Sequence, residues 1–380
     1  MRLCYIGDIS SVHTRRWIEF FARRGYDVHV ISTTPPRSPG GSSAELPMVT
    51  MHSLPLPRRG SYFQNLLFGL FTMPARVWKL RRLLRELDPD VVHVHYLNEA
   101  ALFSVFAGLR PLVLTAWGSD ILVAPEKSWI RKQAVTYTLR RADLITCDAD
   151  HMKQRLVRLG ADPEKVKVVF FGIDVERFHP RRRDGGVRRR LSAGAAPLVI
   201  SIRSLEPVYD VASLIRAMPA VLERFPQMIF LIGGSGSLAA ALGALAAQLG
   251  VQASVRFLGA LSQEELPAYL ASSDVYVSTA LSDGGIAAST AEAMASGLPV
   301  VITDVADNRQ WVEDGASGFL VPPGQPGILA QRIIQLLEAE EAKARMGTRG
   351  RQVIVERNNL HTEMSKIERL YQSLAAGAPG

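Results

Sequence analysis

The chain has 380 residues, of which 47% are hydrophobic and 21% charged, a globular composition that excludes disordered and fibrous proteins. It has two cysteines, Cys4 and Cys147, which excludes a disulfide-rich scaffold and a cysteine-rich zinc module and fits a reducing compartment. No apolar run reaches the ~20 residues of a membrane-spanning helix. We therefore expect a cytoplasmic protein of two domains.

The net charge of +8 is unevenly distributed along the chain. Up to Pro180 there are 25 basic and 17 acidic residues, and beyond it there are 19 of each. The excess predicts that the first half meets an anionic partner, such as a membrane surface or a phosphorylated acceptor. A solvated basic surface with no partner is the alternative. The chain carries no nucleic-acid recognition motif, so we expect no nucleic acid as partner.

Short apolar runs rich in β-branched residues alternate with longer amphipathic segments in both halves of the chain. The strands expected in the first half are residues 3–7, 28–32, 91–95, 112–116, 144–147 and 166–170. Those of the second half are residues 198–202, 228–232, 255–258, 275–278, 299–303 and 318–321. This alternation predicts an α/β protein with two doubly wound parallel sheets and right-handed crossovers. Ligands are then expected at the carboxyl ends of the strands.

The domain boundary is expected near residues 180–186, where proline, glycine and charged residues gather. We predict a first domain over residues 1–180, a linker over 181–197 and a second domain over 198–359. Residues 360–374 follow a helical pattern beyond the last expected strand, so residues 360–380 are predicted to form a helix and tail that cross back to the first domain.

Residues 62–85 combine an apolar and a basic segment. Aromatic and aliphatic residues precede Pro74, and five cations follow it: Arg76, Lys79, Arg81, Arg82 and Arg85. Such a segment is typical of a helix that lies at a membrane surface. It also fits an ordinary crossover helix packed on its sheet, and both interpretations can hold together.

The most informative stretch is residues 282–301, which runs from a strand end through a glycine-rich turn into a helix and on to another strand. Glycine lets the backbone approach a ligand closely. The start of the helix offers free N–H groups and a positive dipole to a phosphate. Glu292 lies further along the helix, where a carboxylate could accept hydrogen bonds from ribose hydroxyls.

This stretch resembles the donor-site motif of the family 4 retaining glycosyltransferases, which have the GT-B fold of two Rossmann-like domains facing a cleft. Further segments resemble other family motifs in the same order, so the resemblance covers nearly the whole chain. These segments are residues 90–95, 171–180, 202–217, 255–259 and 314–322.

The resemblance implies transfer of a sugar from a nucleotide diphosphate sugar to an acceptor hydroxyl with retained anomeric configuration, in polysaccharide, glycolipid or other glycoconjugate synthesis. Glu292 matches the acid that holds the donor ribose, Asp283 stands for the acid that contacts the donor sugar, and Arg203 matches the arginine that clamps the diphosphate. Asp283, Arg203 and Asp120 are the predicted catalytic residues. The donor-binding residues expected besides Arg203, Asp283 and Glu292 are Gly234, Leu258, Gly284, Gly285, Ile286, Ala287 and Ser289.

The chain departs from the family pattern at several of these places. Asp283 and Glu292 are separated by one residue more than in the family, so Gly284 occupies the usual position of the first acid. Glu206 and its neighbours stand where the family has a lysine that contacts phosphate, and Trp117 stands where many relatives have an active-site histidine. The acceptor side is assigned to Gly7, His13, His95 and Trp117, at or after expected strand ends of the first domain.

No cofactor or obligatory metal is expected beyond the donor itself. His93 and His95 share one face of a strand and could bind a metal, but no third ligand follows from the sequence. The missing lysine leaves a non-catalytic sugar-nucleotide-binding or scaffold protein as an alternative, and a GT-B epimerase is another. The expected location is the cytoplasm, with contact to the inner face of a membrane as a candidate feature.

Overall fold

The computed structural model describes residues 1–9, 11–33, 48–54, 62–108 and 110–377, and the side chains of the helix over residues 62–87 from residue 73 on. The chain divides into two compact units. Unit 1 contains Met1–Phe171 and Glu363–Gly380, and unit 2 contains Gly172–Thr362.

Unit 1 is built on a sheet of seven strands in the order β3-β2-β1-β4-β5-β6-β7, and all of its paired strands are parallel. Parallel strands are covered on both faces and therefore read as continuous apolar runs. The strands are β1 (Arg2–Gly7), β2 (Asp27–Ser32), β3 (Val49–Ser53), β4 (Val91–His95), β5 (Leu112–Thr115), β6 (Leu144–Cys147) and β7 (Val166–Val168).

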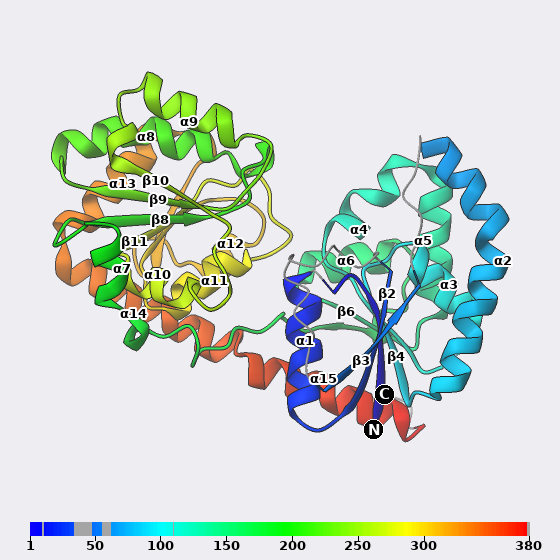
Figure 1. The fold of residues 1–380 in the computed structure, drawn as a ribbon. Helices are drawn as coiled ribbons and strands as arrows, with labels where there is room; N and C mark the ends of the chain where they lie inside the picture. The colour runs from blue at the N-terminus through cyan, green and yellow to red at the C-terminus, as the bar shows by residue number, and fades with distance from the viewer. Residues whose placement is uncertain (10, 34–47, 55–61, 109, 378–380) are drawn as a thin grey trace. The chain divides into compact units, whose positions relative to one another are not determined.

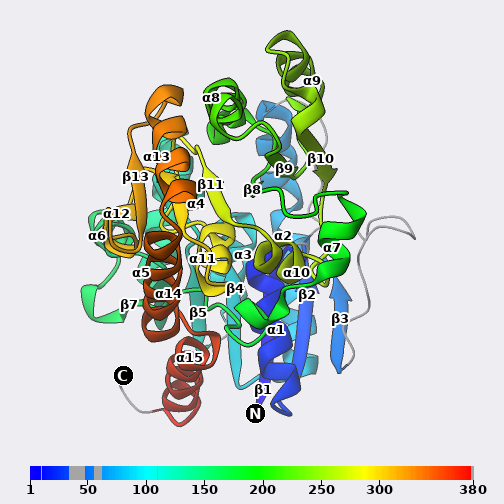
Figure 2. The same ribbon diagram turned by 90° about the vertical axis from the view of Figure 1, so that its left-hand side faces the viewer.

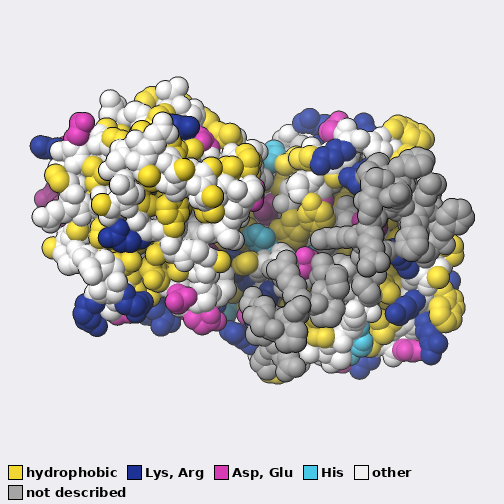
Figure 3. Space-filling view, turned by 45° about the horizontal axis from the view of Figure 1, so that its top comes forward, with side chains coloured by type: hydrophobic (Ala, Val, Ile, Leu, Met, Phe, Trp, Pro, Cys, Tyr) yellow, Lys and Arg dark blue, Asp and Glu magenta, His cyan; other side chains and the backbone are white. Residues whose placement is uncertain are grey.

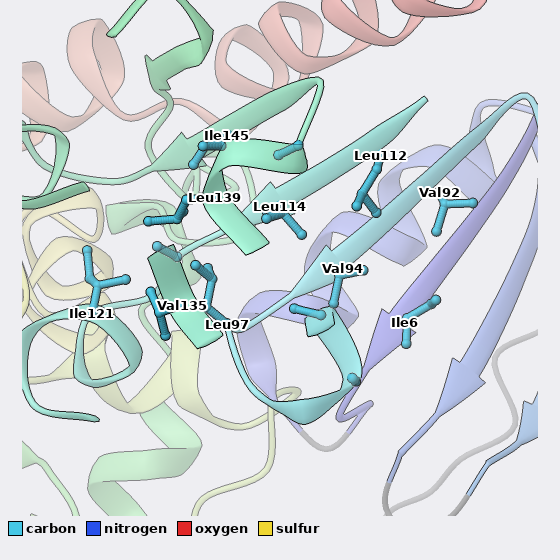
Figure 4. Close-up of a cluster of buried hydrophobic side chains, with 14 of the residues drawn as sticks. Ile6, Val92, Val94, Leu97, Leu112, Leu114, Ile121, Val135, Leu139 and Ile145 are labelled. Carbon is cyan, nitrogen blue, oxygen red and sulfur yellow. The ribbon is translucent and has the colours of Figure 1, made fainter. Parts of the chain in front are cut away.

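Helices cover both faces of this sheet (Figure 1). They are α1 (Val12–Arg23), α2 (Tyr62–Leu87), α3 (Glu99–Ala107), α4 (Ser119–Leu122), α5 (Trp129–Arg141), α6 (Asp150–Arg158) and α15 (Leu360–Ala375), with 3₁₀ turns η1 (Ala124–Lys127) and η2 (Pro163–Lys165). Helices α2, α3, α5 and α6 bury one face in a cluster with Ile6, Val94 and Leu114, whose side chains point into the core shown in Figure 4.

The other face of the sheet has a different chemistry. Because successive strand side chains point to opposite faces, Tyr5, His93 and Thr115 lie on the side away from that cluster. They are buried there with Trp17 of α1 and Tyr371 of α15. This polar and aromatic face leads directly to the carboxyl ends of β1, β4 and β5.

All six strands expected in the first half are present, although β5 and β7 end earlier than expected. Strand β3 was not predicted. Its residues, VTMHS, are at most half-buried and pair only with β2 at the edge of the sheet. An edge strand of this kind has no continuous apolar run by which the sequence could reveal it.

Unit 2 contains a six-stranded sheet in the order β10-β9-β8-β11-β12-β13, again with parallel pairs. Its strands are β8 (Leu198–Ile202), β9 (Ile229–Gly233), β10 (Val255–Gly259), β11 (Val275–Ser278), β12 (Val300–Thr303) and β13 (Gly318–Val321), within a residue or so of the predicted bounds. The two doubly wound parallel sheets confirm the expected fold class.

The helices of unit 2 also form two layers, which Figure 2 shows from a second side. Helices α8, α9 and α13 pack their apolar faces on one side of the sheet, while α10, α11 and α14 lie on the other. The bounds are α7 (Gly185–Arg190), α8 (Val211–Arg224), α9 (Ala239–Gln248), α10 (Leu266–Ser272), α11 (Ala288–Ala295), α12 (Asn308–Trp311), α13 (Pro326–Glu338) and α14 (Glu340–Arg357). The 3₁₀ turns are η3 (Pro180–Arg182), η4 (Pro207–Tyr209) and η5 (Gln252–Ser254).

Residues 172–197 lie beyond the boundary between the units, which follows Phe171 rather than the expected Pro180, and they include the expected linker over 181–197. They belong to unit 2 and include η3 and α7. The physical reason is that Arg188 is not a free cation of a linker. Its guanidinium pairs with Asp274 at 2.8 Å and donates to the Ser272 carbonyl, while Val187 beside it is fully buried.

The last helix returns to unit 1, as the sequence predicts. From Glu363 onward α15 belongs to that unit. There Glu363 accepts a hydrogen bond from the Phe170 amide at 3.0 Å, and Glu368 accepts from Tyr26 at 2.7 Å.

Charged side chains on the face seen in Figure 3 form separate groups of Lys and Arg over both units. Within the described ranges, no helix has the length and apolar character needed to cross a bilayer.

Candidate functional site

Three loops of unit 2 meet where β8, β9 and β11 end. Residues 203–210 follow β8, residues 234–238 follow β9 and residues 279–287 follow β11. Backbone hydrogen bonds join them: the Leu205 amide donates to the Ser235 carbonyl at 2.9 Å, and the Leu281 amide donates to the Val208 carbonyl at 2.8 Å. The carboxyl edge of a doubly wound sheet is where such folds bind ligands.

Two glycines make this junction possible. A Cβ on Gly234, whose φ is +136°, would lie 2.0 Å from the Arg203 carbonyl oxygen. A Cβ on Gly236 would lie 2.3 Å from the Leu205 carbonyl oxygen. Gly234, predicted to bind the donor, is therefore also required for the loops to touch.

Arg203 is the cation of this junction. Its side chain is 7% exposed, one guanidinium nitrogen lies 2.5 Å from Asp283 Oδ1, and its Cζ lies 4.3 Å from the ring centre of Tyr209. Burial acts to lower the pKa of Arg203, but the charge of Asp283 raises it above the usual value. The structure thus places Arg203 and Asp283, both predicted from the sequence, in direct contact.

Asp283 is also largely buried, with 12% of its side chain exposed. Its pKa is raised because burial of the carboxylate outweighs the attraction of Arg203. The contact with Arg203 was not expected, since the resemblance assigns Asp283 to hydroxyls of the donor sugar.

Glu292 lies inside α11 and is only 3% exposed. Ala287 caps the start of this helix, and Gly285 and Ile286 before it are buried. Ser289, in its first turn, forms a 2.8 Å hydrogen bond with the hydroxyl of the buried Tyr276 on β11. Tyr276 thereby fixes the start of the helix that follows the loop with Gly284.

Leu258 and Glu206 complete the surroundings. Leu258 is half-buried on β10, and the next residue, Gly259, accepts a hydrogen bond from the Gly234 amide at 2.7 Å. Glu206, where the family has phosphate-binding residues, accepts from the Ser237 amide at 2.8 Å and from its hydroxyl at 2.6 Å. These bonds lower the pKa of Glu206 and tie two of the loops together.

A second cluster lies at the carboxyl ends of β1, β4 and β5 in unit 1. The rings of His13 and Trp117 stack at 4.8 Å, and the Trp117 ring lies 5.6 Å from that of His95. Gly7 belongs here because a Cβ on it would lie 3.3 Å from both Cβ and the carbonyl oxygen of His95. The four residues assigned to the acceptor side therefore come together in one place.

The histidines of this cluster are neutral at physiological pH. Burial lowers the pKa of His13 to about 4 and that of His95 to about 3. His95 Nδ1 and Thr14 Oγ1 form a hydrogen bond at 3.2 Å. In the described part of the chain, His13 Nδ1, His95 Nε2 and the indole nitrogens of Trp17 and Trp117 are buried without a hydrogen-bond partner.

Asp120, expected to be catalytic, has backbone amides as partners in the structure. It is fully buried, and its carboxylate accepts hydrogen bonds from the amides of Leu97 at 3.0 Å and Gly118 at 2.9 Å, and from Trp117. Burial nevertheless raises its pKa. A carboxylate held by backbone amides fixes the loop that carries Trp117, and its catalytic role stays a prediction.

Both ring nitrogens of His93 have hydrogen-bond partners. Its Nε2 lies 2.6 Å from Thr115 Oγ1, and its Nδ1 meets the hydroxyl of Tyr371. No group of three or more His, Cys, Asp or Glu side chains suited to a metal occurs among the described residues.

The sequence did not point to Tyr209 or Trp17. Tyr209 lies within the segment that departs from the family pattern, and that departure was the available signal. Trp17 follows the apolar spacing of α1 and reads as an ordinary core residue, although its ring lies 5.2 Å from that of His95.

Two doubly wound parallel sheets, the second with a buried arginine among glycine-rich loops, are the architecture of the GT-B fold. Solved structures agree on the fold: Anabaena HepE in complex with UDP matches with a TM-score of 0.82 and 20% identity, over 98% of this chain and 100% of that one.

Comparison with known families gives the same answer. Residues 188–353 match the family described as glycosyl transferases group 1, and residues 2–149 match the family described as glycosyl transferase 4-like. The chain belongs to the family 4 glycosyltransferases, as the sequence motifs predict.

Curated relatives include mannosyltransferases. The phosphatidyl-myo-inositol mannosyltransferase of Mycobacterium tuberculosis is 28% identical over 389 residues, covering 97% of this chain and 94% of the relative. The GDP-mannose-dependent alpha-(1-6)-phosphatidylinositol monomannoside mannosyltransferase of Mycolicibacterium smegmatis is 28% identical over 295 residues, covering 73% of this chain and 75% of the relative.

Proposed function

We propose that this glycosyltransferase moves a sugar from a nucleotide diphosphate sugar to an acceptor hydroxyl with retention of anomeric configuration. The observation that carries the proposal is the junction of three loops around Arg203 in unit 2, with the start of α11 beside it and Glu292 inside that helix. The complex of HepE with UDP supports a nucleotide ligand at this kind of fold.

Each group then has a role in the transfer. Arg203 and the N–H groups at the start of α11 stabilise the negative charge that develops on the departing diphosphate. Glu292 accepts hydrogen bonds from the donor ribose. We assign no carboxylate as a covalent nucleophile, so the proposed chemistry is front-face substitution in which the leaving phosphate assists deprotonation of the acceptor. The proposal includes no metal cofactor.

The acceptor is assigned to unit 1. The pair of His13 and Trp117 presents partly exposed, stacked rings at the carboxyl edge of the sheet, and aromatic faces of this kind suit the apolar faces of sugar rings. The relatives' names mention phosphatidylinositol and its mannosides. We therefore propose a lipid-linked or glycan acceptor.

A lipid acceptor implies work at a membrane surface, and α2 offers a suitable face. Trp78 is 63% exposed, and the guanidinium of Arg82 lies 5.8 Å from its ring centre. Arg81 and Arg85 line the same depression as Trp78 and Arg82. Tryptophan beside cations suits the headgroup region of an anionic bilayer, so we propose that the enzyme binds the inner face of a membrane through α2. The apolar half of the candidate segment, up to residue 72, has side chains outside the described set.

The first experiment is a thermal-shift screen of the full chain with UDP, GDP and ADP sugars. A ligand that binds only the folded form stabilises it by ~2.7 kcal/mol at 100 times its dissociation constant. We expect one nucleotide class to raise the melting temperature of the wild type and of the control Glu223→Ala, an exposed residue of α8. Glu292→Ala and Glu292→Gln should abolish the shift, with ligand-free melting curves showing whether each variant is folded.

Turnover decides among the alternatives. NMR of the products should show sugar transfer with the anomeric configuration of the donor retained, and activity should persist in EDTA. Donor binding without transfer to any acceptor in cell extracts would favour a non-catalytic binding protein. Conversion of the donor sugar without transfer would favour an epimerase. If no nucleotide sugar shifts the wild type, the proposed donor site is refuted.

A further inference from the structure

The contact between Arg203 and Asp283 has a consequence for ligand binding. Both side chains are nearly buried, and their closest nitrogen and oxygen atoms are 2.5 Å apart. A buried guanidinium without a counter-charge would be costly, whereas a hydrogen-bonded pair offsets much of that cost. Asp283 therefore supplies to Arg203 the negative charge that an anionic ligand would otherwise supply.

The charges of the three loops indicate that Asp283 and an anionic ligand compete for Arg203. Residues 203–210, 234–238 and 279–287 are all described, and they contain one cation, Arg203, against the three carboxylates Glu206, Asp210 and Asp283. Glu206 is bound to Ser237, and Asp210 accepts a 2.5 Å hydrogen bond from the Ser213 hydroxyl. Asp283 is thus the carboxylate that neutralises the one cation of these three loops.

The surroundings hold Arg203 in place, whereas Asp283 lies on a glycine-containing loop. Tyr209 lies against the guanidinium, and the Tyr209 and Asp210 carbonyls accept hydrogen bonds from the Thr279 hydroxyl at 3.1 and 2.9 Å. Asp283 is followed at once by Gly284 and Gly285, whose backbone has the conformational freedom to redirect the carboxylate. The Asp283 carboxylate accepts a hydrogen bond from Arg203.

We propose that Asp283 is an internal counter-ion that the donor's diphosphate must displace from Arg203, and that its return to Arg203 promotes release of the nucleoside diphosphate product. This inference rests on the proposed function. It differs from the role that the family resemblance gives Asp283, a contact to hydroxyls of the donor sugar. No bond is made or broken by Asp283; an ion pair is exchanged for another.

Three roles for Asp283 predict three different outcomes when its charge is removed. As an internal competitor, its loss leaves Arg203 free and tightens binding of a diphosphate. As a sugar contact, its loss weakens binding of the nucleotide sugar and leaves the nucleoside diphosphate unaffected. As a residue that merely positions Arg203, its loss weakens binding of both.

The test measures dissociation constants of UDP, GDP and ADP and of their sugars by calorimetry, on wild type and Asp283→Asn. We expect the nucleoside diphosphate that binds the wild type to bind Asp283→Asn about tenfold more tightly, equivalent to about 1.4 kcal/mol. Stopped-flow dissociation of that ligand should slow by a similar factor. The nucleoside without phosphates should bind both proteins equally.

The matched control is Asp304→Asn, which removes the partner of Arg309 in an exposed Asp–Arg pair of the same unit. It should leave nucleotide affinity unchanged. Equal or weaker binding of the nucleoside diphosphate by Asp283→Asn overturns the inference. If no nucleotide binds the wild type, the proposed function falls and the inference falls with it. Binding that depends on Glu292 but is not tightened by Asp283→Asn overturns the inference alone.

A second measurement keeps the inference testable if Asp283→Asn does not fold. Wild-type protein labelled with ¹³C at the aspartate carboxyl carbons is followed by NMR during titration with the nucleoside diphosphate. The Asp283 signal should move from that of a buried, paired carboxylate toward that of a solvated one. A signal that stays in place while the ligand binds would refute displacement.

Discussion

Lowering the pH should reduce the free energy of unfolding of unit 1, because the folded unit keeps His95 neutral. This side chain is 2% exposed and lies among the rings of Tyr5, Trp17, His93 and Trp117, with the Thr14 hydroxyl as its hydrogen-bond partner. No carboxylate is among these neighbours to stabilise a positive charge. Burial therefore lowers its pKa to about 3, against 6.5 in the unfolded chain.

The sign and size of the effect follow from proton linkage. Below pH 6.5 His95 binds a proton in the unfolded state, whereas in the folded state it stays neutral down to about pH 3. The free energy of unfolding therefore falls as the pH falls through this window. At pH 5 the difference amounts to about 2 kcal/mol from His95 alone. Well above pH 6.5 both states are neutral and the contribution vanishes.

The assay is urea unfolding of the full chain at pH 7 and pH 5, followed by tryptophan fluorescence. Four of the five tryptophans lie in unit 1, so the signal reports mainly on that unit. The comparison is between wild type and His95→Gln, whose own destabilisation cancels in the difference between the two pH values. We expect the wild type to lose about 2 kcal/mol more than the variant. Equal losses in the two proteins would show that His95 does not carry the effect.

Two further predictions concern unit 1. Tyr371→Phe removes the hydroxyl that meets His93 Nδ1 and lies 3.2 Å from the Tyr5 hydroxyl. Because buried polar atoms then lose a partner, the free energy of unfolding in urea titrations should fall by about 1–3 kcal/mol. An unchanged midpoint would mean that this contact of α15 does not stabilise the protein. Trp78→Ala combined with Arg82→Ala should weaken binding to phosphatidylglycerol vesicles, measured by sedimentation, at least fivefold. Each cation near an anionic surface contributes about 1 kcal/mol to such binding. The control Phe257→Ala, which removes an exposed aromatic side chain of unit 2, should leave vesicle binding unchanged. If the wild type binds neutral phosphatidylcholine vesicles as tightly as phosphatidylglycerol vesicles, the cations of α2 do not contribute to membrane binding.

The sheets could be predicted from the sequence because their strands are buried on both faces. Runs such as Leu198–Ile202 are apolar throughout, and each lies between turn residues and an amphipathic helix. The expected linker failed for the opposite reason. Its arginines read as a solvated charge run, but the partner of Arg188 is Asp274, a residue distant in sequence that no local pattern connects to it.

The candidate site divides in the same way. The positions of Arg203 and Gly234 could be predicted because each directly follows a strand, and that of Glu292 because it lies in the helix of a recognisable strand-turn-helix segment. The pairing of Arg203 with Asp283 depends on how the loops after β8 and β11 touch through Val208 and Leu281. The amide contacts of Asp120 could not be predicted, because a carboxylate at a strand end has the same sequence pattern whether it faces a ligand or backbone amides.

The return of α15 to unit 1 determines when that unit can be completed during synthesis. All residues of unit 2, Gly172–Thr362, leave the ribosome before Tyr371 does. Until then the buried face of the first sheet lacks the hydroxyl that meets His93, and Phe170 lacks the carboxylate of Glu363. The half of the enzyme that begins the chain is therefore the last to be finished, and a chain that stops short of its final helix should carry a defect in its first domain rather than in its second.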